Sequence, residues 1–329
     1  MIIAKAPLRI SFLGGGTDYP AYFSQYGGAT LAASINKYNI ITVNRITQFA
    51  EYKLRVHYSQ VESVKYIDEI KHPSARECLR FLGFKEGIEI HYLSDLPART
   101  GLGSSSSATA GLLTALHAFK GEKAGQEQIA AEAVYVEQEL IKENVGCQDQ
   151  YICALGGLMH LEFQQDKKVN LRRITLSQSR LKELKERLML FYTGMQRDAH
   201  TILFEQIKRT SSGENNEYLE RLKMLVGEGV KLLAKDKKIS DFGALLHEGW
   251  MLKRRLSSKV TTPFVDQAYA KARRAGALGG KLLGAGGGGF LLLFVEPPNQ
   301  EEVRQELSGL YETKFSFEHS GTQVIFNLA

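Results

Sequence analysis

The sequence predicts an α+β protein with two domains. The chain of 329 residues is longer than one hydrophobic core usually organises. Its strand-like and helix-like segments are mixed without a regular strand–helix–strand alternation, which argues against a doubly wound parallel sheet. A hydrophobic content of 43% and a charged content of 24% are typical of a globular protein, so a disordered or fibrous chain is excluded.

The first half of the chain is expected to consist mainly of strands. Runs of β-branched and aromatic residues between turn signals predict strands at residues 7–13, 30–35, 38–46, 52–58, 87–96 and 156–163. Helices are expected at residues 73–84, 104–119 and 126–142, the second with an apolar stripe through Leu112, Leu116 and Phe119. Because the polar stretch at residues 164–168 follows, we expect one domain over residues 1–170 and another over residues 171–329.

The second half of the chain is a more even mixture. Strands are expected at residues 188–193, 281–295, 314–319 and 322–328. Helical patterns occur around residues 199–207, 218–233, 241–256 and 263–275, and another helix is expected after Pro298. The longest uninterrupted apolar run, residues 290–295, is too short to span a bilayer.

The charge pattern and the cysteines limit which kinds of molecule and metal ion the protein is expected to bind. The net charge of +6 arises from basic and acidic residues that alternate along most of the chain, with no aromatic platform beside a basic stripe, so we expect no nucleic acid and no membrane. A modest positive excess suits an enzyme that handles anionic small molecules. Cys78, Cys147 and Cys153 match no zinc spacing and are expected to be free thiols. No secretory signal is visible at the start, so we expect a cytoplasmic protein.

Glycine clusters mark three segments where the backbone has an unusual course: residues 14–16, 101 with 103, and 284 with 286–289. The middle segment, residues 96–108, reads LPARTGLGSSSSA and joins a predicted strand to a predicted helix. Glycines permit close approach to a phosphate chain, and a helix N-terminus offers free N–H groups and a partial positive charge. This pattern favours a phosphate-binding loop, with a flexible Gly/Ser loop as the alternative.

The two commonest nucleotide motifs do not fit. Gly280 and Lys281 are followed by Leu282, whereas a Walker A loop requires Ser or Thr there. Residues 284–289 match G-x-G-x-x-G by letter, but they continue into an apolar strand instead of a helix. We therefore expect no dinucleotide site.

Four charged residues are candidates for the chemistry. Glu137 borders the buried face of its predicted helix, where Mg²⁺ carried in with ATP would suit its carboxylate; a salt bridge at the helix edge is the alternative. Asp149, in a non-periodic stretch, could accept a proton from a substrate hydroxyl or orient it, or could be an ordinary cap. Arg9 interrupts an apolar strand, which suggests an inward anion partner unless the side chain faces solvent. Asp18 is typical of a turn and also of a group that accepts from sugar hydroxyls.

Three motifs together resemble the GHMP family of small-molecule kinases. They read KAPLRISFLGGGTDY at residues 5–19, PARTGLGSSSSA at residues 97–108 and KLLGAGGGGF at residues 281–290. The resemblance spans nearly the whole chain. It implies an N-terminal α+β domain related to ribosomal-protein-type folds, a C-terminal ferredoxin-like domain and an active site in the cleft between them.

The resemblance also implies roles for individual residues. Ser105 and Glu137 match the Mg²⁺ ligands, and Asp149 matches the catalytic aspartate. Arg9 takes the position of the basic residue that lowers the pKa of the attacking hydroxyl or stabilises transferred charge. The implied ATP-binding residues are Pro97, Gly101, Leu102, Gly103, Ser104, Ser105, Ser106 and Ser107. The implied substrate-binding residues are Gly16, Thr17, Asp18, Tyr19, Gly286 and Gly287.

Details of the motifs narrow the implied substrate. The GGGTD form at residues 14–18 replaces the GEHTD form of galactokinases. This form and the segments at residues 146–151 and 246–263 are most similar to those of the family members that act on D-glycero-D-manno-heptose 7-phosphate. Those members transfer the γ-phosphate of ATP to the anomeric O1 of the sugar. The resemblance thus implies a role in the synthesis of GDP-heptose for cell-surface glycans. The sugar-kinase part of L-fucokinase is the next most similar, and a non-catalytic nucleotide-binding protein is a minor alternative.

A sugar that already carries a phosphate needs a second anion site. Lys253, Arg254, Arg255 and Lys259 could provide it, because guanidinium groups in particular suit phosphate oxygens. Cations near the end of a helix are also commonly solvated and favourable to the helix dipole, so that alternative stays open. We expect a monomer or a homodimer.

Overall fold

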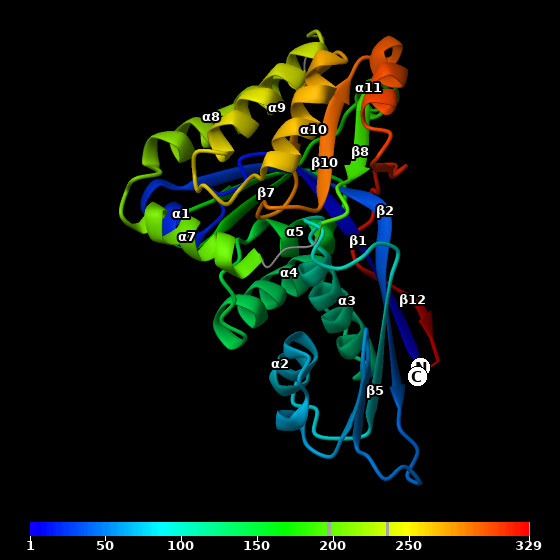
Figure 1. Ribbon diagram of the computed structural model, residues 1–329. Coiled ribbons are helices and arrows are strands. Elements are labelled where there is room, and N and C mark those ends of the chain that lie inside the picture. Colours follow the sequence, from blue (N-terminus) through cyan, green and yellow to red (C-terminus); the bar gives the residue numbers. More distant parts are fainter. Residues whose placement is uncertain (196–198, 235–236, 329) are drawn as a thin grey trace.

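The computed structural model describes residues 1–195, 199–234 and 237–328, which form two β-sheets with helices packed against them (Figure 1). The first sheet has eight strands. Its strands are β1 (Ile2–Leu13), β2 (Gly28–Arg45), β3 (Leu54–His57), β4 (Val61–Val64), β5 (Ile88–Ser94), β6 (Leu158–Phe163), β7 (Val169–Arg173) and β12 (Gln323–Asn327). They follow the order β12-β1-β2-β5-β3-β4, with β6 paired to β2 and β7 paired to β6.

The long strand β2 replaces two shorter predicted strands. Its register against β1 jumps from Tyr38, opposite Pro7, to Ile35, opposite Leu8. The two residues between them form an irregularity that bends the strand without ending it. As a result, the first part of β2 pairs with β6 and its last part pairs with β5.

Five helices accompany the first sheet in the chain: α1 (Pro20–Tyr26), α2 (Pro73–Phe81), α3 (Ser104–Phe119), α4 (Gln126–Tyr135) and α5 (Gln148–Leu155). The helix α3 packs on β1 and β2, and its predicted apolar stripe is buried there through Leu112 and Leu116. The predicted helix at residues 126–142 is α4 followed by a π-helical turn, Val136–Leu140. The helix α5 was not expected from the sequence.

The second sheet is antiparallel and has four strands in the order β11-β8-β10-β9. They are β8 (Leu188–Tyr192), β9 (Ala277–Leu282), β10 (Phe290–Val295) and β11 (Tyr311–Glu312). The accompanying helices are α6 (Gln178–Glu186), α7 (Ala199–Ser211), α8 (Asn216–Ala234), α9 (Ser240–Lys253), α10 (Pro263–Arg274) and α11 (Gln300–Glu306). The single strand predicted at residues 281–295 is instead the end of β9, a glycine loop and β10. The strand predicted at residues 314–319 is reduced to one bridge between Ile35 and Phe317.

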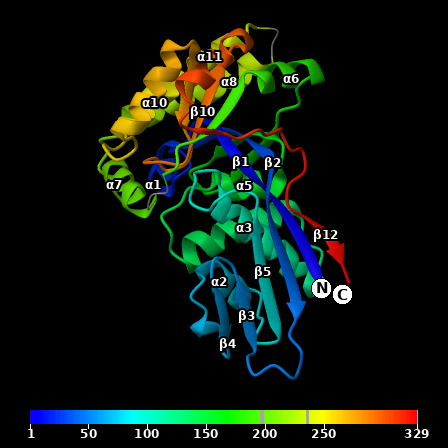
Figure 2. The same cartoon turned by 45° about the vertical axis from the view of Figure 1, so that its right-hand side comes forward.

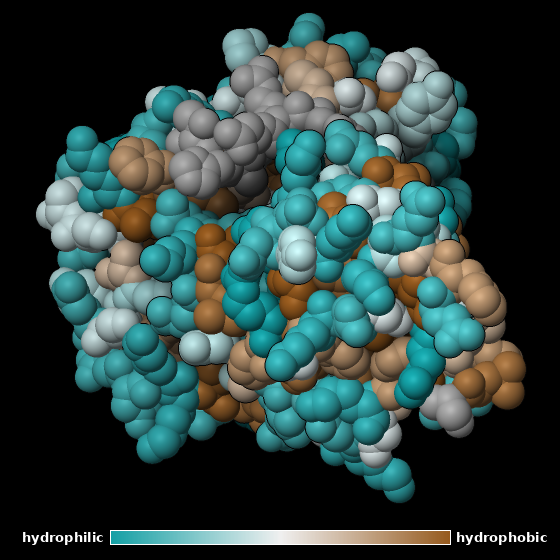
Figure 3. Space-filling view, turned by 90° about the horizontal axis from the view of Figure 1, so that it is seen from below, coloured by the Kyte–Doolittle hydropathy of each residue, from teal (hydrophilic) through white to brown (hydrophobic). Residues whose placement is uncertain are grey.

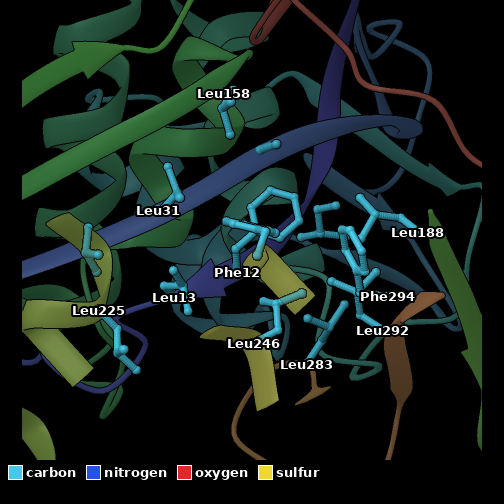
Figure 4. Close-up of a cluster of buried hydrophobic side chains, with 14 of the residues drawn as sticks. Phe12, Leu13, Leu31, Leu158, Leu188, Leu225, Leu246, Leu283, Leu292 and Phe294 are labelled. Carbon is cyan, nitrogen blue, oxygen red and sulfur yellow. The ribbon is translucent and has the colours of Figure 1, made fainter. Parts of the chain in front are cut away.

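One hydrophobic cluster contains residues of both halves, among them Phe12 and Phe294 (Figure 4). Phe12 of β1 lies against Phe242 of α9, with ring centroids 5.5 Å apart, and Phe242 lies 6.3 Å from Phe294 of β10. Residue 170, near which the sequence predicts the domain change, lies within β7, while β12 crosses back from the predicted second domain to pair with β1 (Figure 2). The division into residues 1–170 and 171–329 stays a prediction.

The surface is that of an ordinary globular protein. Seen from the side of α2 and β5, it is mainly hydrophilic, with apolar residues in small groups (Figure 3). Among the described residues, none of the helices is both long and apolar enough to cross a membrane. Cys78, Cys147 and Cys153 are buried and unpaired, as predicted.

Candidate active site

The end of β1 forms a tight turn that positions Asp18. Gly14 lies so close to the neighbouring strand that an added Cβ would be 2.0 Å from the carbonyl oxygen of Ala29. The hydroxyl of Thr17 donates to the carbonyl oxygens of Gly14 and Ala29, each at 2.8 Å. Thr17 is a predicted substrate-binding residue, but its hydroxyl is already hydrogen-bonded within the turn. These hydrogen bonds fix the position of the next residue, Asp18.

The Asp18 carboxylate is buried between two backbone segments. Its Oδ1 accepts a hydrogen bond from the N–H of Gly16 at 2.9 Å, and its Oδ2 accepts a longer one from the N–H of Gln148 at 3.4 Å. A Cβ on Gly146 would lie 1.9 Å from that second oxygen, so any other residue there would displace the carboxylate. Burial raises the pKa of Asp18 above its ordinary value. The same carboxylate helps to raise the pKa of Tyr19, after burial of the phenol itself.

Arg9 and Asp149 form a bidentate ion pair. Nε of Arg9 donates to Oδ1 of Asp149 at 2.7 Å, and Nη2 donates to Oδ2 at 2.6 Å. The Arg9 side chain is 3% exposed and that of Asp149 is 25% exposed, so the pair is closed on one side and open on the other. Burial opposes the charged guanidinium, but the Asp149 carboxylate outweighs it and the pKa of Arg9 is raised. The predicted inward anion partner of Arg9 is therefore Asp149.

The predicted phosphate-binding loop lies directly beside this pair. Nη1 of Arg9 donates to the carbonyl oxygen of Gly101 at 2.5 Å. Gly101 and Gly103 adopt positive φ angles of 84° and 70°, and α3 begins at the next residue, Ser104. The loop therefore leads directly into a helix N-terminus, where an anion can bind, and its role as a phosphate site stays a prediction.

The third glycine segment packs against the second. A Cβ on Gly284 would lie 2.5 Å from the Cα of Gly101, and one on Gly289 would lie 2.3 Å from the carbonyl oxygen of Thr100. Farther along, Gly287 donates its N–H to the carbonyl oxygen of Val260 at 2.9 Å, and a Cβ on Gly286 would collide with the same oxygen. The glycines therefore allow backbone from the two halves to meet beside the loop.

Glu137 lies in the π-helical turn after α4 and is 1% exposed. Its Oε2 accepts from the hydroxyl of Ser106 at 2.8 Å and from Nε2 of Gln150 at 2.5 Å, while its Oε1 is buried without a partner. Burial raises the pKa of Glu137 to about 7. π-Helical turns are often found at functional sites. An unpartnered carboxylate oxygen beside a hydroxyl is a donor set that fits Mg²⁺.

The serine on Glu137 differs from the one expected. The sequence predicts Ser105 as the second Mg²⁺ ligand, but Ser105 is exposed and the hydroxyl that reaches the carboxylate is that of Ser106. Another serine of the run, Ser107, donates to the carbonyl oxygen of Ala6 at 3.1 Å and so attaches α3 to β1. The ligand role of Ser105 stays a prediction that this geometry does not favour.

Two buried lysines lie near the ion pair. Lys253, the last residue of α9, donates to the carbonyl oxygen of Gly284 at 3.0 Å, and its Nζ would lie 3.6 Å from a Cβ on Gly15. Lys281 donates to the carbonyl oxygen of Phe12 at 3.1 Å. Burial lowers the pKa of both lysines, and Asp18 and Asp149 act in the opposite direction on each. Lys281 was not predicted as part of the site, whereas Lys253 was predicted for the second anion site and not for the surroundings of Asp18 and Asp149.

The three cationic side chains at residues 253–255, predicted as one group, point to different parts of the structure. Arg254 pairs with Asp266 of α10 at 2.9 Å, and the guanidinium carbon of Arg255 lies 5.7 Å from the ring centroid of Tyr218 in α8. Only Lys253 turns toward Asp18 and Asp149. The sequence did contain a signal for this, because Lys253 follows Leu246 and Trp250 at helical spacing on the buried face of α9.

A glycine-rich loop at a helix N-terminus, with an arginine-bound carboxylate beside it, defines a class of protein that brings a phosphate chain and an acceptor hydroxyl together. Residues 68–157 match the model of the GHMP kinases N terminal domain, and residues 230–313 match that of the GHMP kinases C terminal domain. The chain belongs to the GHMP kinase family, and it is a phosphotransferase with an alcohol group as acceptor.

Individual relatives agree with this family. The D-glycero-alpha-D-manno-heptose 7-phosphate kinase of Campylobacter jejuni is 28% identical over 98% of this chain and 98% of its own length. The bifunctional fucokinase/GDP-fucose pyrophosphorylase of Arabidopsis thaliana is 26% identical over 92% of this chain, which spans 31% of that longer protein. The structure described as a D-glycero-D-manno-heptose 1-phosphate kinase from Bacteriodes thetaiotaomicron has the same fold, with a TM-score of 0.80, 24% identity and full coverage of both chains.

Proposed function

We propose that the chain is an ATP-dependent sugar kinase that phosphorylates the anomeric O1 of D-glycero-D-manno-heptose 7-phosphate and yields the 1,7-bisphosphate. The product would serve GDP-heptose synthesis for cell-surface glycans in the cytoplasm, and the enzyme would act as a monomer or a homodimer. The observation that carries the proposal is the Asp149 carboxylate, held by buried Arg9 yet open on one side, directly beside the glycine loop. Similarity to the Campylobacter jejuni enzyme over nearly the whole of both chains supports the choice of sugar.

In the proposed reaction, Asp149 accepts a hydrogen bond from the acceptor hydroxyl and orients it toward the γ-phosphate. Arg9 fixes the plane of the carboxylate through its two hydrogen bonds. Phosphoryl transfer proceeds largely through positioning and charge stabilisation, so a fixed carboxylate and nearby cations are the contributions expected of the protein. Asp18 and Tyr19, with Gly16 and Thr17 in the same turn, would contact the sugar hydroxyls.

The proposed ATP site is the loop from Pro97 through Ser107 at the start of α3. Glu137 with Ser106, or with Ser105 as the sequence predicts, would hold Mg²⁺. An ion held by these residues would supply positive charge against the phosphate groups during transfer. Lys253 and Lys281 add positive charge from the other half of the chain. Gly286 and Gly287 would lie along the sugar.

The proposed site for the second phosphate is Arg254 with Arg255. Each guanidinium is partly exposed and already has a neighbour, Asp266 for the first and Tyr218 for the second. Replacing both by glutamate should raise KM for a phosphosugar and leave KM for ATP unchanged. Equal effects on the two KM values would contradict this role.

A neutral-sugar 1-kinase similar to L-fucokinase is the second candidate. Two fucokinase-containing proteins match 92% of this chain at 26% identity, which is nearly as similar as the heptose enzyme. The terminal phosphate of the acceptor separates the two candidates, since only the heptose enzyme needs a site for it.

The experiment is ATP turnover by the purified chain with Mg²⁺, measured with D-glycero-D-manno-heptose 7-phosphate, the unphosphorylated heptose, L-fucose and galactose. Asp149→Asn is the control for chemistry at this site. We expect turnover with the phosphorylated heptose, with the new phosphate on O1 in a ³¹P NMR spectrum. Turnover with L-fucose alone would mean that the substrate is a neutral sugar and that Arg254 and Arg255 bind no substrate phosphate. Undiminished turnover by Asp149→Asn would discard the proposed site.

A further inference from the structure

Two histidines and a glutamate converge on one face of the first sheet. The strands β3 and β5 are parallel neighbours, with His57 opposite His91 and Arg55 opposite Glu89. Because side chains two residues apart on a strand share a face, His57, Glu89 and His91 all lie on the same face. This group, the β3–β5 cluster, takes no part in the proposed reaction.

The ligand atoms of the β3–β5 cluster already lie at short range. Nε2 of His57 is 3.1 Å from Oε1 of Glu89, and Nε2 of His91 is 3.4 Å from the same oxygen. One ligand atom from each residue lies within 4.8 Å of the other two. The imidazole rings stack with centroids 4.0 Å apart and an angle of 13° between their planes, so at least one ring has to turn before both Nε2 lone pairs meet at one ion.

We propose that His57, Glu89 and His91 form a binding site for a divalent transition-metal ion of the Zn²⁺ class. The ion would take the place of the hydrogen now shared between imidazole nitrogen and carboxylate oxygen, after rotation of the stacked imidazoles so that both lone pairs point to it. Two imidazoles and one carboxylate suit Zn²⁺, Co²⁺ or Ni²⁺, whereas Mg²⁺ and Ca²⁺ prefer oxygen ligands alone. The three side chains are 23%, 21% and 38% exposed, which leaves water access to complete the coordination.

One charged group on the same face as the cluster bears directly on its affinity for a cation. Arg55, on the same face, brings its Nη1 to 3.8 Å from Oε1 of Glu89 and donates to the hydroxyl of Tyr52 at 2.9 Å. Its positive charge competes with a cation, so affinity is set in part by Arg55.

The cluster is separate from the candidate active site. The strands β3 and β5 lie at the lower end of the first sheet, whereas α5 and β10 lie in the upper half of the molecule (Figure 2). A metal ion there would join two strands instead of entering the reaction. We therefore expect it to change stability and not turnover.

The test uses the full chain without a histidine tag, treated with EDTA and dialysed. Titration with Co²⁺, followed by visible absorption, and with Zn²⁺, followed by calorimetry, should each give one equivalent bound. We expect His57→Ala, His91→Ala and Glu89→Gln each to weaken binding about tenfold or more, and His319→Ala, which changes an exposed histidine elsewhere, to leave it unchanged. Zn²⁺ should raise the thermal midpoint of the wild type and of His319→Ala, and should not raise that of the three ligand variants.

Arg55→Gln keeps all three ligands and removes the competing charge, so it should bind both ions more tightly than the wild type. It also provides a test that survives if a histidine variant folds poorly. Wild-type affinity in both histidine variants, absence of any binding by the wild type, or weaker binding by Arg55→Gln would each overturn the site. Kinase turnover with Mg²⁺ should be the same with and without one equivalent of Zn²⁺.

Discussion

Arg9 binds both carboxylate oxygens of Asp149, at 2.7 and 2.6 Å, although the two residues lie 140 positions apart in the chain. Arg9 comes from the buried strand β1, and Asp149 lies in the first turn of α5. Because the guanidinium occupies one edge of the carboxylate, the opposite lone pairs are the ones that can accept from a ligand hydroxyl. The pair therefore sets the direction from which an acceptor approaches.

Asp149→Asn should lower kcat by about 10²- to 10⁴-fold, because an amide cannot take a proton from the substrate hydroxyl and would set its NH₂ donor against an N–H donor of Arg9. KM for ATP should change little. Steady-state kinetics with the phosphorylated heptose checks this.

Arg9→Met should lower kcat as well, and the double variant should lose no more than the worse single one, because the arginine acts through the carboxylate. Additive losses in the double-mutant cycle would show that the two residues act independently.

Lys253→Met should lower kcat/KM for the sugar about tenfold or more, since it removes a buried positive charge from the surroundings of Asp18 and Asp149. Lys182→Met is the matched control, because Lys182 has a side chain that is 75% exposed and makes only a surface pair with Glu186 at 3.7 Å. Kinetics equal to those of the control variant would remove Lys253 from the site.

Gly146→Ala should misplace the Asp18 carboxylate, because the new Cβ would lie 1.9 Å from its Oδ2. A displacement of about 1 Å at such a group costs on the order of 10²-fold in kcat/KM. The control is Gly227→Ala, at a position in α8 with no atom within 4 Å of the added Cβ, which should retain activity and gain slightly in stability. A fully active Gly146→Ala enzyme would mean that Asp18 does not position the acceptor.

Ser106→Ala should raise the Mg²⁺ concentration needed for half-maximal turnover, because it removes the hydroxyl on Glu137. Ser105→Ala should have a smaller effect, since Ser105 is exposed. Turnover measured against Mg²⁺ at saturating ATP distinguishes the two serines. A larger effect of Ser105→Ala than of Ser106→Ala would support Ser105 as the Mg²⁺ ligand, as the sequence predicts.

Stability near pH 6 should depend on His72, the N-cap of α2. Its Nδ1 accepts from the N–H of Ala75 at 3.2 Å, which requires the neutral ring. Burial lowers its pKa below the ordinary 6.5, with a partial opposing effect of Glu62. The unfolded chain therefore binds a proton more readily, so this stabilisation is complete above pH 6.5 and is lost as the pH falls through the lowered value.

The measurement is urea unfolding at pH 7.5 and pH 5.5. His72→Asn keeps a side-chain cap that does not titrate in this range, so it should lose less free energy of unfolding than the wild type on acidification. His72→Ala should be about 1 kcal/mol less stable than His72→Asn at pH 7.5. Parallel pH profiles for the wild type and His72→Asn would show that another group is responsible.

Much of the fold follows from local patterns. The strand β10 is a continuous apolar run, and α3 has apolar residues at helical spacing, so both are predictable. The helix α5 is not, because its eight residues are too few to show a period and Gly146 and Gly156 on either side look like turns. The predicted loop around Asp149 is therefore the first turn of a helix.

The candidate site likewise has residues that the sequence could identify and residues that it could not. Its anion loop, Arg9, Asp18, Glu137 and Asp149 could be selected from residue type and position. The choice among four consecutive serines could not, because each step along a helix rotates the side chain by about 100° and only packing decides which hydroxyl meets Glu137. Lys253 belongs to the other half of the chain, and its approach to Asp18 depends on how the two halves pack.

The pairing of β12 with β1 has a consequence for synthesis. Gln323 lies opposite Lys5, so the outer edge of the first strand receives its partner only after roughly 300 further residues have been made. At about 5 to 20 residues per second, this takes about 15 to 60 s. Throughout that interval an apolar strand has an unpaired edge, which is a typical starting point for aggregation. The nascent chain is thus expected to be at its most vulnerable while its amino-terminal sheet is otherwise complete.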